Sequence, residues 1–337
     1  MLKTILEKVS DGDDLTRNEA AAALETIVRD EASPTEVGGL LIGLRVKGET
    51  EEEILGFVET MEKYMVKVHL QNQDAIDVCG TGGDGKHSFN VSTTTAIVVA
   101  AEGVSVAKHG NRSVSGRTGS ADLLQELGVK IDLNADKVKQ CVDEIGIGFF
   151  FAPLFHPAMK NVALHRKNLG LRTVFNMLGP LLNPARVKRQ LIGAYDSETA
   201  KKLAVVLKMR GYTKACTVHS LDGFDEVSPF SQNDIFEVNK NLNEIKTYRF
   251  EKPYGKFGLD EITGDDQRKN AGITLSVLAG EKNAAREMVV LNSGFAFYVA
   301  GKTNTVEDGI LLAENVLDSG AAKRKLDQFV EMSNRLN

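Results

Sequence analysis

Three glycines and an acid crowd one short stretch of this chain, the run Gly80-Thr81-Gly82-Gly83-Asp84. Glycine has no side chain, so such a loop can bring bare backbone N–H groups close to a phosphate. A second polar run, Asn90-Val91-Ser92-Thr93, stands at the expected start of an apolar helix, where the N–H groups and the helix dipole also favour anions. These residues predict a phosphorylated small molecule as the ligand.

Short predicted strands must position these runs. We expect strands at Ala75 to Cys79 and at Val104 to Ala107, with a helix from Thr94 to Ala101 between them. The loop that follows the second strand begins at Lys108 and contains Gly110. In an open α/β sheet, ligands bind in the crevice beyond the carboxyl ends of the strands. We therefore expect both glycine-containing loops to meet at one crevice.

Two common phosphate-binding patterns match the first loop only in part. Gly80, Gly82 and Gly85 have the spacing of a dinucleotide-binding loop, but no helix opens on them and no acid ends the next predicted strand. Gly80, Gly85 and Lys86 approach a nucleotide-triphosphate loop, but His87 stands where that loop needs a serine or threonine for magnesium. The sequence favours neither pattern.

The composition limits the class of protein. The 337 residues, of which 42% are hydrophobic, suffice for a large core. The net charge of −5, with both signs interspersed, argues against nucleic acid or an anionic membrane as the main partner. Cys79, Cys141 and Cys216 are too widely spaced for a metal pair, and no apolar run approaches the ~20 residues of a membrane span. We expect a soluble protein of the cytoplasm.

The chain divides into two unequal parts. Capping-box patterns at Thr16, Ser33 and Thr50 predict a small all-helical domain over 1–72. Over 73–337, short β-rich runs, such as Ala215 to His219 and Met288 to Leu291, alternate with helical ones. This texture predicts an α/β domain with a largely parallel central sheet that helices cover.

A proline-marked passage covers 149–189. Four of the seven prolines of the chain lie there and bracket one predicted helical stretch. Prolines mark changes of chain direction. We expect part of this passage, 160–189, to join the helical domain.

Two adjacent carboxylates suggest a metal site. Asp225 and Glu226 follow a predicted strand, and Mg²⁺ is commonly held by one or two carboxylates together with substrate phosphates. A solvated acidic turn is the alternative, and the nearby phosphate-type loops favour the metal. Lys108 could pair with a phosphate. His109 and His156 lack metal-ligand spacing, so we expect them to line a pocket.

Seven blocks in fixed order resemble those of the anthranilate phosphoribosyltransferases of tryptophan biosynthesis. The blocks cover 80–84, 90–93, 108–115, 119–122, 156–160, 172–184 and 222–226. The resemblance implies a helical N-terminal domain, a large α/β domain and a homodimer formed through the helical part. It also implies transfer of the phosphoribosyl group of 5-phosphoribosyl 1-pyrophosphate (PRPP) to the amine of anthranilate, with Mg²⁺ as cofactor.

The resemblance further implies a role for each site residue. The implied contacts to PRPP are Gly80, Gly83, Asp84, Ser88, Asn90, Val91, Ser92, Thr93, Lys108, His109, Gly110, Asn111, Arg112, Ser113, Val114, Ser115, Gly116 and Ser120. Those to anthranilate are Gly80, His109, Asn111, His156 and Arg166, and those to Mg²⁺ are Ser92, Asp225 and Glu226. Among these, Lys108 would neutralise the leaving pyrophosphate, while Asn111 and Arg166 would hold the acceptor.

Two other functions stay open at this point. A pyrimidine-nucleoside phosphorylase shares the expected fold, and 115–119 faintly resembles its phosphate loop, but this chain is short for that family and carries the Asp225–Glu226 pair. A non-catalytic relative that binds nucleic acid is opposed by the net charge of −5 and by the intact donor motifs.

Overall fold

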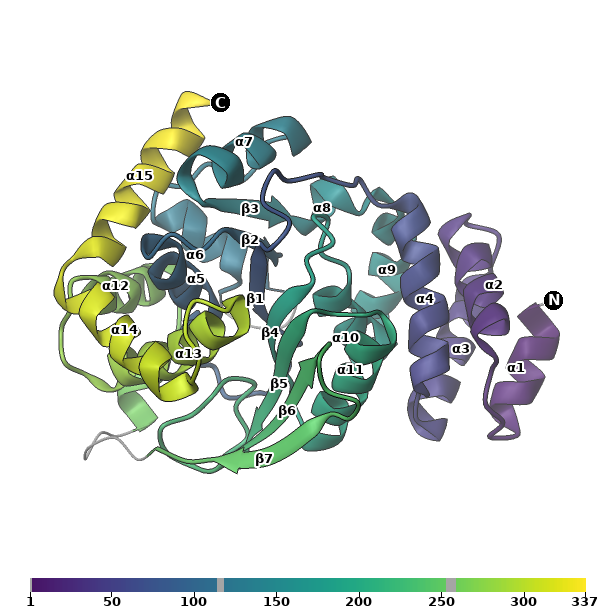
Figure 1. Cartoon of the computed structure of the whole chain (residues 1–337). Helices are drawn as coiled ribbons and strands as arrows, with labels where there is room; N and C mark the ends of the chain where they lie inside the picture. Colours follow the sequence, from purple (N-terminus) through teal and green to yellow (C-terminus); the bar gives the residue numbers. More distant parts are fainter. Residues whose placement is uncertain (1, 114–117, 253–258) are drawn as a thin grey trace.

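The computed structural model describes residues 2–113, 118–252 and 259–337, and its N-terminal part is a group of four helices at one end of the molecule (Figure 1). These are α1 (Leu2–Ser10), α2 (Arg17–Val28), α3 (Pro34–Lys47) and α4 (Glu51–Tyr64). The expected capping boxes at Thr16, Ser33 and Thr50 are all present. Each satisfies N–H groups that the first turn of a helix leaves without partners.

Seven strands form one sheet in the order β3-β2-β1-β4-β5-β6-β7. The strands are β1 (Ile76–Gly80), β2 (Val106–Gly110), β3 (Ile147–Phe151), β4 (Arg189–Gly193), β5 (Lys214–Ser220), β6 (Asn233–Asn239) and β7 (Lys246–Phe250). β1 to β5 run parallel, whereas β6 and β7 pair antiparallel at one edge. The expected α/β class with a largely parallel sheet is confirmed.

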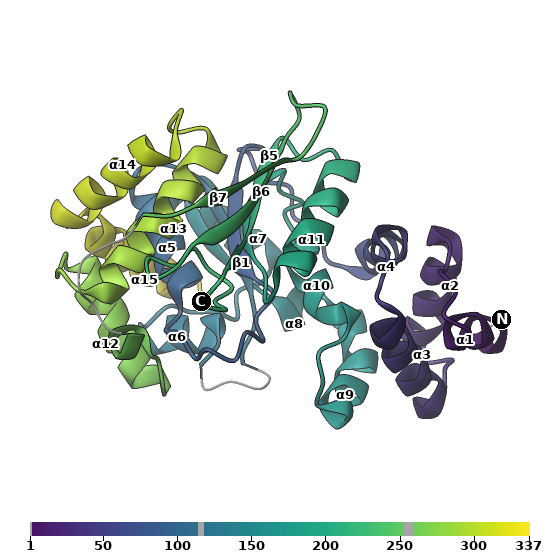
Figure 2. The same cartoon turned by 90° about the horizontal axis from the view of Figure 1, so that it is seen from below.

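Helices cover both faces of this sheet (Figures 1 and 2). They are α5 (Val91–Ala101), α6 (Ser120–Glu126), α7 (Ala135–Ile145), α8 (Ala152–Phe155), α9 (Lys160–Leu169), α10 (Val174–Leu181), α11 (Ser197–Met209), α12 (Gln267–Leu278), α13 (Ala284–Ala300), α14 (Val306–Asp318) and α15 (Ala321–Arg335), with short 3-10 turns at Pro157–Met159 and Leu259–Ile262. Within the described residues, no helix has both the length and the apolarity to cross a membrane.

Two hydrophobic cores lie on opposite faces of the sheet. Leu191 of β4 belongs to the core under α5, α13 and α14, and the next residue, Ile192, belongs to the core under α10 and α11. Successive side chains of a strand point to opposite faces, so this alternation is expected. The second core continues without a break into α1 to α4. The helical part is therefore anchored to one face of the sheet through α10 and α11.

The structure corrects several expected elements. Met288 to Leu291 is not a strand but the middle of α13, where all four residues are fully buried. A helix that is buried all round carries no polar face, so its apolar run looks like a buried strand. The second strand runs from Val106 to Gly110, so Lys108 lies within it rather than after it.

Two further corrections concern helices. The helix expected from Thr94 begins at Val91, so the polar residues Ser92 and Thr93 belong to its first turn. The passage 149–189 contains the end of strand β3, helices α8, α9 and α10 and the first residue of β4 rather than one helical stretch. Pro153 and Pro157 stand at the starts of α8 and of the 3-10 turn that follows it, whereas α9 ends before Gly170, which has a φ of 61°, and Pro180 lies inside α10. Figure 2 shows α9 and α10 between the sheet and the helical part.

Candidate active site

The site lies where the strand order of the sheet reverses. From β1 the chain proceeds outward through β2 and β3, and then returns to place β4 on the other side of β1. Such a switch point opens a crevice at the carboxyl ends of the two central strands, which is where open α/β sheets bind ligands. The carboxyl ends of β1 and β4 are Gly80 and Gly193, which are paired in register.

These two glycines make room for one acid. A Cβ atom on Gly80 would lie 2.4 Å from Oδ2 of Asp225, and one on Gly193 would lie 1.4 Å from the carbonyl oxygen of Asp225. Neither distance is sterically possible, so Asp225 can sit in the crevice, side chain against Gly80 and backbone against Gly193, only because both strands end in glycine.

The glycine loop that follows β1 is held by the same acid. The N–H of Gly82 donates to Oδ2 of Asp225 at 2.8 Å. Gly82, Gly83 and Gly85 have φ values of 64°, 78° and 73°, a region that other residues rarely adopt. Asp84 closes the turn, since its Oδ1 accepts from the N–H of Lys86 at 3.1 Å. The three glycines of the loop are therefore required by its conformation.

Asp84, Asp225 and Glu226 form a carboxylate cluster, in which one ligand oxygen of each lies within 4.8 Å of the others. Two buried oxygens of this cluster, Oδ2 of Asp84 and Oε2 of Glu226, have no hydrogen-bond partner among the described residues. Burial and the neighbouring carboxylates raise the pKa of both Asp225 and Glu226. Converging, unpartnered carboxylate oxygens that repel one another fit a hard divalent cation such as Mg²⁺.

The first turn of α5 makes contacts of its own, apart from the carboxylate cluster. Asn90 occupies the N-cap position, yet its side chain makes no capping hydrogen bond. Oγ1 of Thr93 is buried and has no partner among the described residues. Ser92, which is expected to meet the metal, lies with its Oγ 3.4 Å from Nζ of Lys108. The structure thus groups Ser92 with Lys108, and no described contact joins it to the carboxylates.

Lys108 is buried rather than solvated. Only 3% of its surface is exposed, and its Nζ donates to the carbonyl of Val78 at 2.8 Å. Burial lowers the pKa of Lys108, and the nearby Asp77 opposes this shift. Asp77 is fully buried and accepts from the N–H of His109 and from Nδ2 of Asn183. Sequence reasoning missed Asp77, although a single acid inside the apolar strand was a usable signal.

His109 and His156, which are expected to line a pocket, lie in contact with each other. Their Nε2 atoms lie 3.2 Å apart and their ring centroids 5.0 Å apart. Both side chains are buried, and this burial lowers the pKa of His109 well below its ordinary value and that of His156 to about 4. Both imidazoles are therefore neutral at physiological pH, and one Nε2 donates to the other.

This pair predicts acid sensitivity. An unfolded histidine titrates near pH 6.5, so between about pH 6.5 and 4 the unfolded state binds more protons than the folded one. Stability that is present above pH 6.5 is therefore lost as the pH falls towards 4, by at most about 1.4 kcal/mol per pH unit for each histidine. We expect His156→Gln to lose less stability than wild type between pH 7 and 5, measured by urea unfolding.

A matched variant checks this prediction. His69 is exposed, so His69→Gln removes an imidazole without altering the buried pair. It should keep the wild-type pH dependence. Equal pH dependence in wild type and His156→Gln would contradict the assignment.

The loop after β2 is organised by Asp122. Its two oxygens accept from Nη1 of Arg112 at 2.6 Å and from the N–H of Gly119 at 3.0 Å. The amide of Asn111 accepts from the N–H of Arg112 at 2.7 Å. A Cβ atom on Gly110 would lie 2.4 Å from Oγ of Ser120, so the two ends of the loop touch. The predicted PRPP contacts Val114, Ser115 and Gly116 lie outside the described residues.

Arg166 lies in the last turn of α9, with its guanidinium 5.5 Å from the ring centroid of Phe175 in α10. Burial lowers the pKa of Arg166, and no carboxylate in the described part of the chain offsets this shift. The residue after Phe175, Asn176, faces the glycine loop, with its Nδ2 3.9 Å from where a Cβ on Gly83 would lie. Arg166 is thus a half-buried cation for which the described residues supply no carboxylate, and the helix that it contacts, α10, reaches the glycine loop through Asn176.

Arg172 connects the two parts of the protein, which sequence reasoning did not foresee. Its Nη1 donates to the carbonyl of Gly83 at 3.2 Å, and its guanidinium lies 4.2 Å from the ring centroid of Tyr195. Nη1 of Arg45 in α3 donates to the carbonyl of Arg172 at 2.8 Å. Arg172 therefore links α3 of the helical part to the glycine loop.

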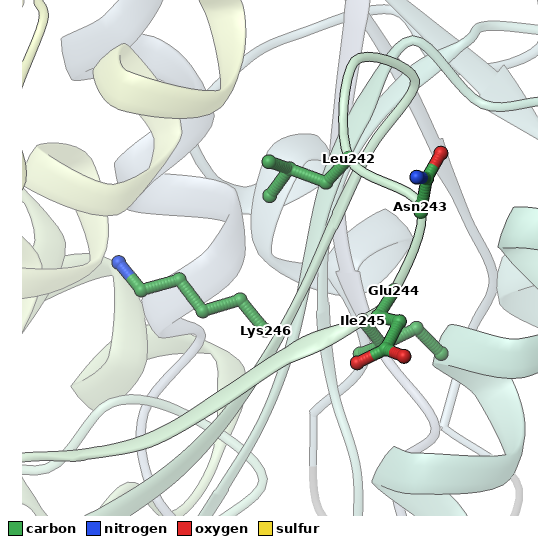
Figure 3. A pocket seen from close by; sticks show the side chains of 5 residues that line it. All are labelled: Leu242, Asn243, Glu244, Ile245 and Lys246. Carbon is green, nitrogen blue, oxygen red and sulfur yellow. The ribbon is translucent and has the colours of Figure 1, made fainter.

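A hollow elsewhere on the protein takes no part in this site. Figure 3 shows its lining residues, Leu242, Asn243, Glu244, Ile245 and Lys246, at the turn between β6 and β7. Because Asn239 at the end of β6 pairs with Lys214 at the start of β5, this turn lies at the amino end of β5. The candidate site lies at the opposite end of the strands, beyond the carboxyl ends of β1 and β4.

Comparison with known proteins places this geometry in a family. The chain matches the helical bundle domain of the glycosyl transferase family over residues 3–65 and the a/b domain of that family over residues 72–323. It is 45% identical to an anthranilate phosphoribosyltransferase of Acetivibrio thermocellus, covering 99% of this chain and 97% of that one. It is also 45% identical to that of a Thermoanaerobacter species, over the full length of both.

Comparison with solved structures leads to the same family. The crystal structure of anthranilate phosphoribosyltransferase from Thermus thermophilus matches with a TM-score of 0.90 at 37% identity, covering 98% of this chain and 99% of that one. The enzyme from Saccharomyces cerevisiae in complex with PRPP and Mg matches with a TM-score of 0.88 at 28% identity, covering 99% and 98%. With full-length identity of this order, the chain belongs to the anthranilate phosphoribosyltransferase family.

Proposed function

We propose that this protein transfers the phosphoribosyl group of PRPP to the amine of anthranilate and releases pyrophosphate. The observation that carries the proposal is the carboxylate cluster of Asp84, Asp225 and Glu226 beside a glycine loop at the switch point of the sheet. A relative from Saccharomyces cerevisiae binds PRPP and Mg, and the same enzyme binds 4-fluoroanthranilate. Family membership and the site chemistry thus support the same reaction.

The donor site would use the two phosphate-type runs and the loop after β2. The residues proposed to contact PRPP are Gly80, Gly83, Asp84, Ser88, Asn90, Val91, Ser92, Thr93, the run 108–116 and Ser120. Asp225 and Glu226, with Ser92, would hold Mg²⁺, which when bound neutralises charge on the pyrophosphate. The backbone N–H groups of the loops add fixed partial positive charge at the leaving group.

The acceptor side would use Gly80, His109, Asn111, His156 and Arg166. In the reaction the bond from C1 of the ribose to the pyrophosphate oxygen breaks, and a bond from C1 to the anthranilate nitrogen forms. An aniline nitrogen is uncharged at neutral pH, so it attacks without prior loss of a proton and sheds one afterwards. Arg166 would pair with the carboxylate of anthranilate, which aligns the amine with C1. Lys108, whose Nζ contacts Val78 and Ser92, would add positive charge next to the proposed PRPP contact Ser92.

We also propose a homodimer formed through the helical part, in the cytoplasm. Two apolar residues of neighbouring helices support the dimer, because Val46 of α3 is 82% exposed and Leu164 of α9 is 62% exposed. Contiguous exposed apolar patches often mark interaction surfaces. The three cysteines make no disulfide, which suits a reducing compartment. Light scattering during size-exclusion chromatography would test the dimer.

Product analysis tests the reaction directly. The protein is incubated with PRPP, anthranilate and Mg²⁺, and the products are identified by mass spectrometry. We expect phosphoribosyl anthranilate and pyrophosphate in equal amounts. A parallel incubation with inorganic phosphate and thymidine or uridine tests the alternative. Phosphorolysis there, with no product from anthranilate, would instead support a nucleoside phosphorylase.

A further inference from the structure

Asn90 does not cap its own helix although it stands at the N-cap position of α5. Asparagine is among the preferred N-cap residues, because its side-chain oxygen accepts from an N–H of the first turn. Here Oδ1 of Asn90 accepts instead from Nδ2 of Asn270 at 3.0 Å, and Nδ2 of Asn90 donates to the carbonyl of Thr118 at 3.1 Å. Its side chain is therefore hydrogen-bonded to two other segments, at Thr118 and at Asn270, instead of to the first turn of α5.

The segments are joined in a closed ring of four hydrogen bonds. The N–H of Asp265 donates to Oδ1 of Asn270 at 2.9 Å, and Oγ1 of Thr118 donates to the carbonyl of Asp265 at 3.0 Å. With the two bonds of Asn90, the ring connects the start of α5, the segment before α6 and the segment before α12. The start of α5 carries the proposed PRPP contacts Asn90 to Thr93, and Thr118 lies two residues before another, Ser120.

The ring fixes which end of each amide points where. A backbone N–H can only donate, so Asp265 requires the oxygen of Asn270 on its side and leaves the NH₂ of Asn270 to face Asn90. A backbone carbonyl can only accept, so Thr118 requires the NH₂ of Asn90. The two constraints agree on the middle bond. One N–H of the Asn90 amide engages Thr118, and the other has no acceptor among the described residues.

Asn270 has no freedom to turn. It is 2% exposed, and a Cβ atom on Gly264 would lie 2.6 Å from its Oδ1. One turn further along the same two helices, the hydroxyls of Thr94 and Thr274 lie 3.1 Å apart. The spacing of four residues on both helices repeats the contact, so α12 is held against α5 at two successive turns.

We infer that Asn270 is a positioning residue for PRPP: it holds the amide of Asn90 with its NH₂, and not its oxygen, towards the pyrophosphate, and it keeps that amide from capping α5. The N–H groups at the start of α5 then stay available to an anion. This inference rests on the proposed donor site. It assigns a role in substrate binding to a buried residue of a helix that no sequence motif connects with the site.

Asn270→Asp is the decisive variant. It keeps the shape and the acceptor for Asp265, but an ionised carboxylate cannot donate to Asn90, so the Asn90 amide turns and presents its oxygen to the anion. We expect the Michaelis constant for PRPP to rise about 10- to 100-fold, the effect of losing a charge-assisted hydrogen bond. The Michaelis constant for anthranilate and kcat at saturating PRPP should change little. Calorimetry should show weaker binding of Mg²⁺–pyrophosphate.

Thr274→Val is the matched control. It removes the neighbouring hydroxyl contact between the same two helices without touching the amides, so it should lower the unfolding temperature and leave the PRPP constants unchanged. If Asn270→Asp does not fold, Asn270→Ala decides by the same comparison, with a smaller rise expected. Unchanged pyrophosphate binding in the folded variant overturns the inference, whether or not the wild type uses anthranilate. Absent turnover in the wild type overturns only the proposed function.

Discussion

Replacing Asp225 by asparagine together with Glu226 by glutamine is expected to reduce turnover by at least about 10²- to 10³-fold, the scale of losing a main electrostatic contact to the leaving group. Both side chains converge on Asp84 at the candidate metal site, and the neutral amides would not hold Mg²⁺. Steady-state rates over a range of Mg²⁺ concentrations would measure the effect.

The double variant should nevertheless fold. Burial raises the pKa of both acids, and the charge of Asp84 raises both further, so the metal-free protein gains from neutral side chains of the same shape. Oδ1 of the new amide can still accept from the N–H of Gly82. We expect the unfolding temperature without metal to be at least that of wild type, and the stabilisation by added Mg²⁺ to disappear.

The chain offers a matched control in a second adjacent acid pair. Asp143 and Glu144 lie in α7, where they contact Gln71 and Gln140 and belong to no carboxylate cluster of the described residues. Asp143→Asn with Glu144→Gln changes the net charge by the same amount and should leave turnover unaltered. Near-normal rates in the Asp225/Glu226 variant would remove the metal assignment.

Arg166→Ala should chiefly weaken the use of anthranilate. The guanidinium is half-buried beside Phe175 and has no carboxylate partner in the described residues, so a substrate carboxylate is the anion that it would pair with. Such a contact is worth about 1.5–3 kcal/mol, or about one to two decades in kcat/KM for anthranilate. The Michaelis constant for PRPP should barely change. Arg166→Lys should recover only part of the loss, because an ammonium lacks the planar fork.

A purely structural role for Arg166 is the competing explanation. Basic residues near the end of a helix are favoured by its dipole, and α9 ends at Gly170, whose N–H donates to the carbonyl of Arg166. Lys167→Ala removes the neighbouring, exposed charge of the same turn and serves as the control. If both variants change only the unfolding temperature and leave anthranilate kinetics intact, the acceptor role is wrong.

Local signals predicted local structure well. The capping boxes at Thr16, Ser33 and Thr50 depend on residues three apart, and the structure contains all three. The glycine loop was equally readable, because positive φ values require glycine at Gly82 and Gly83. Where neighbours in the chain decide the conformation, the sequence was sufficient.

Features that depend on distant partners were not readable. The polar partners of the site include Asp77, Asn183 and Asn270, and each has a hydrogen-bond partner at least 30 positions away in the chain. The strand prediction for Met288 to Leu291 is wrong because nothing in four apolar residues tells that a helix buries them on all sides. The fit of Asp225 between Gly80 and Gly193 likewise exists only once β1 and β4 are paired.

A fluorescence assay of anthranilate consumption tests directly whether this protein is a Mg²⁺-dependent anthranilate phosphoribosyltransferase. PRPP is added to the protein and anthranilate, first in the presence of a chelator and then with excess Mg²⁺. We expect no change of anthranilate fluorescence until Mg²⁺ is supplied, and then a loss that requires both the enzyme and PRPP. Stable fluorescence with Mg²⁺ and PRPP present, or full turnover in chelator, would contradict this assignment.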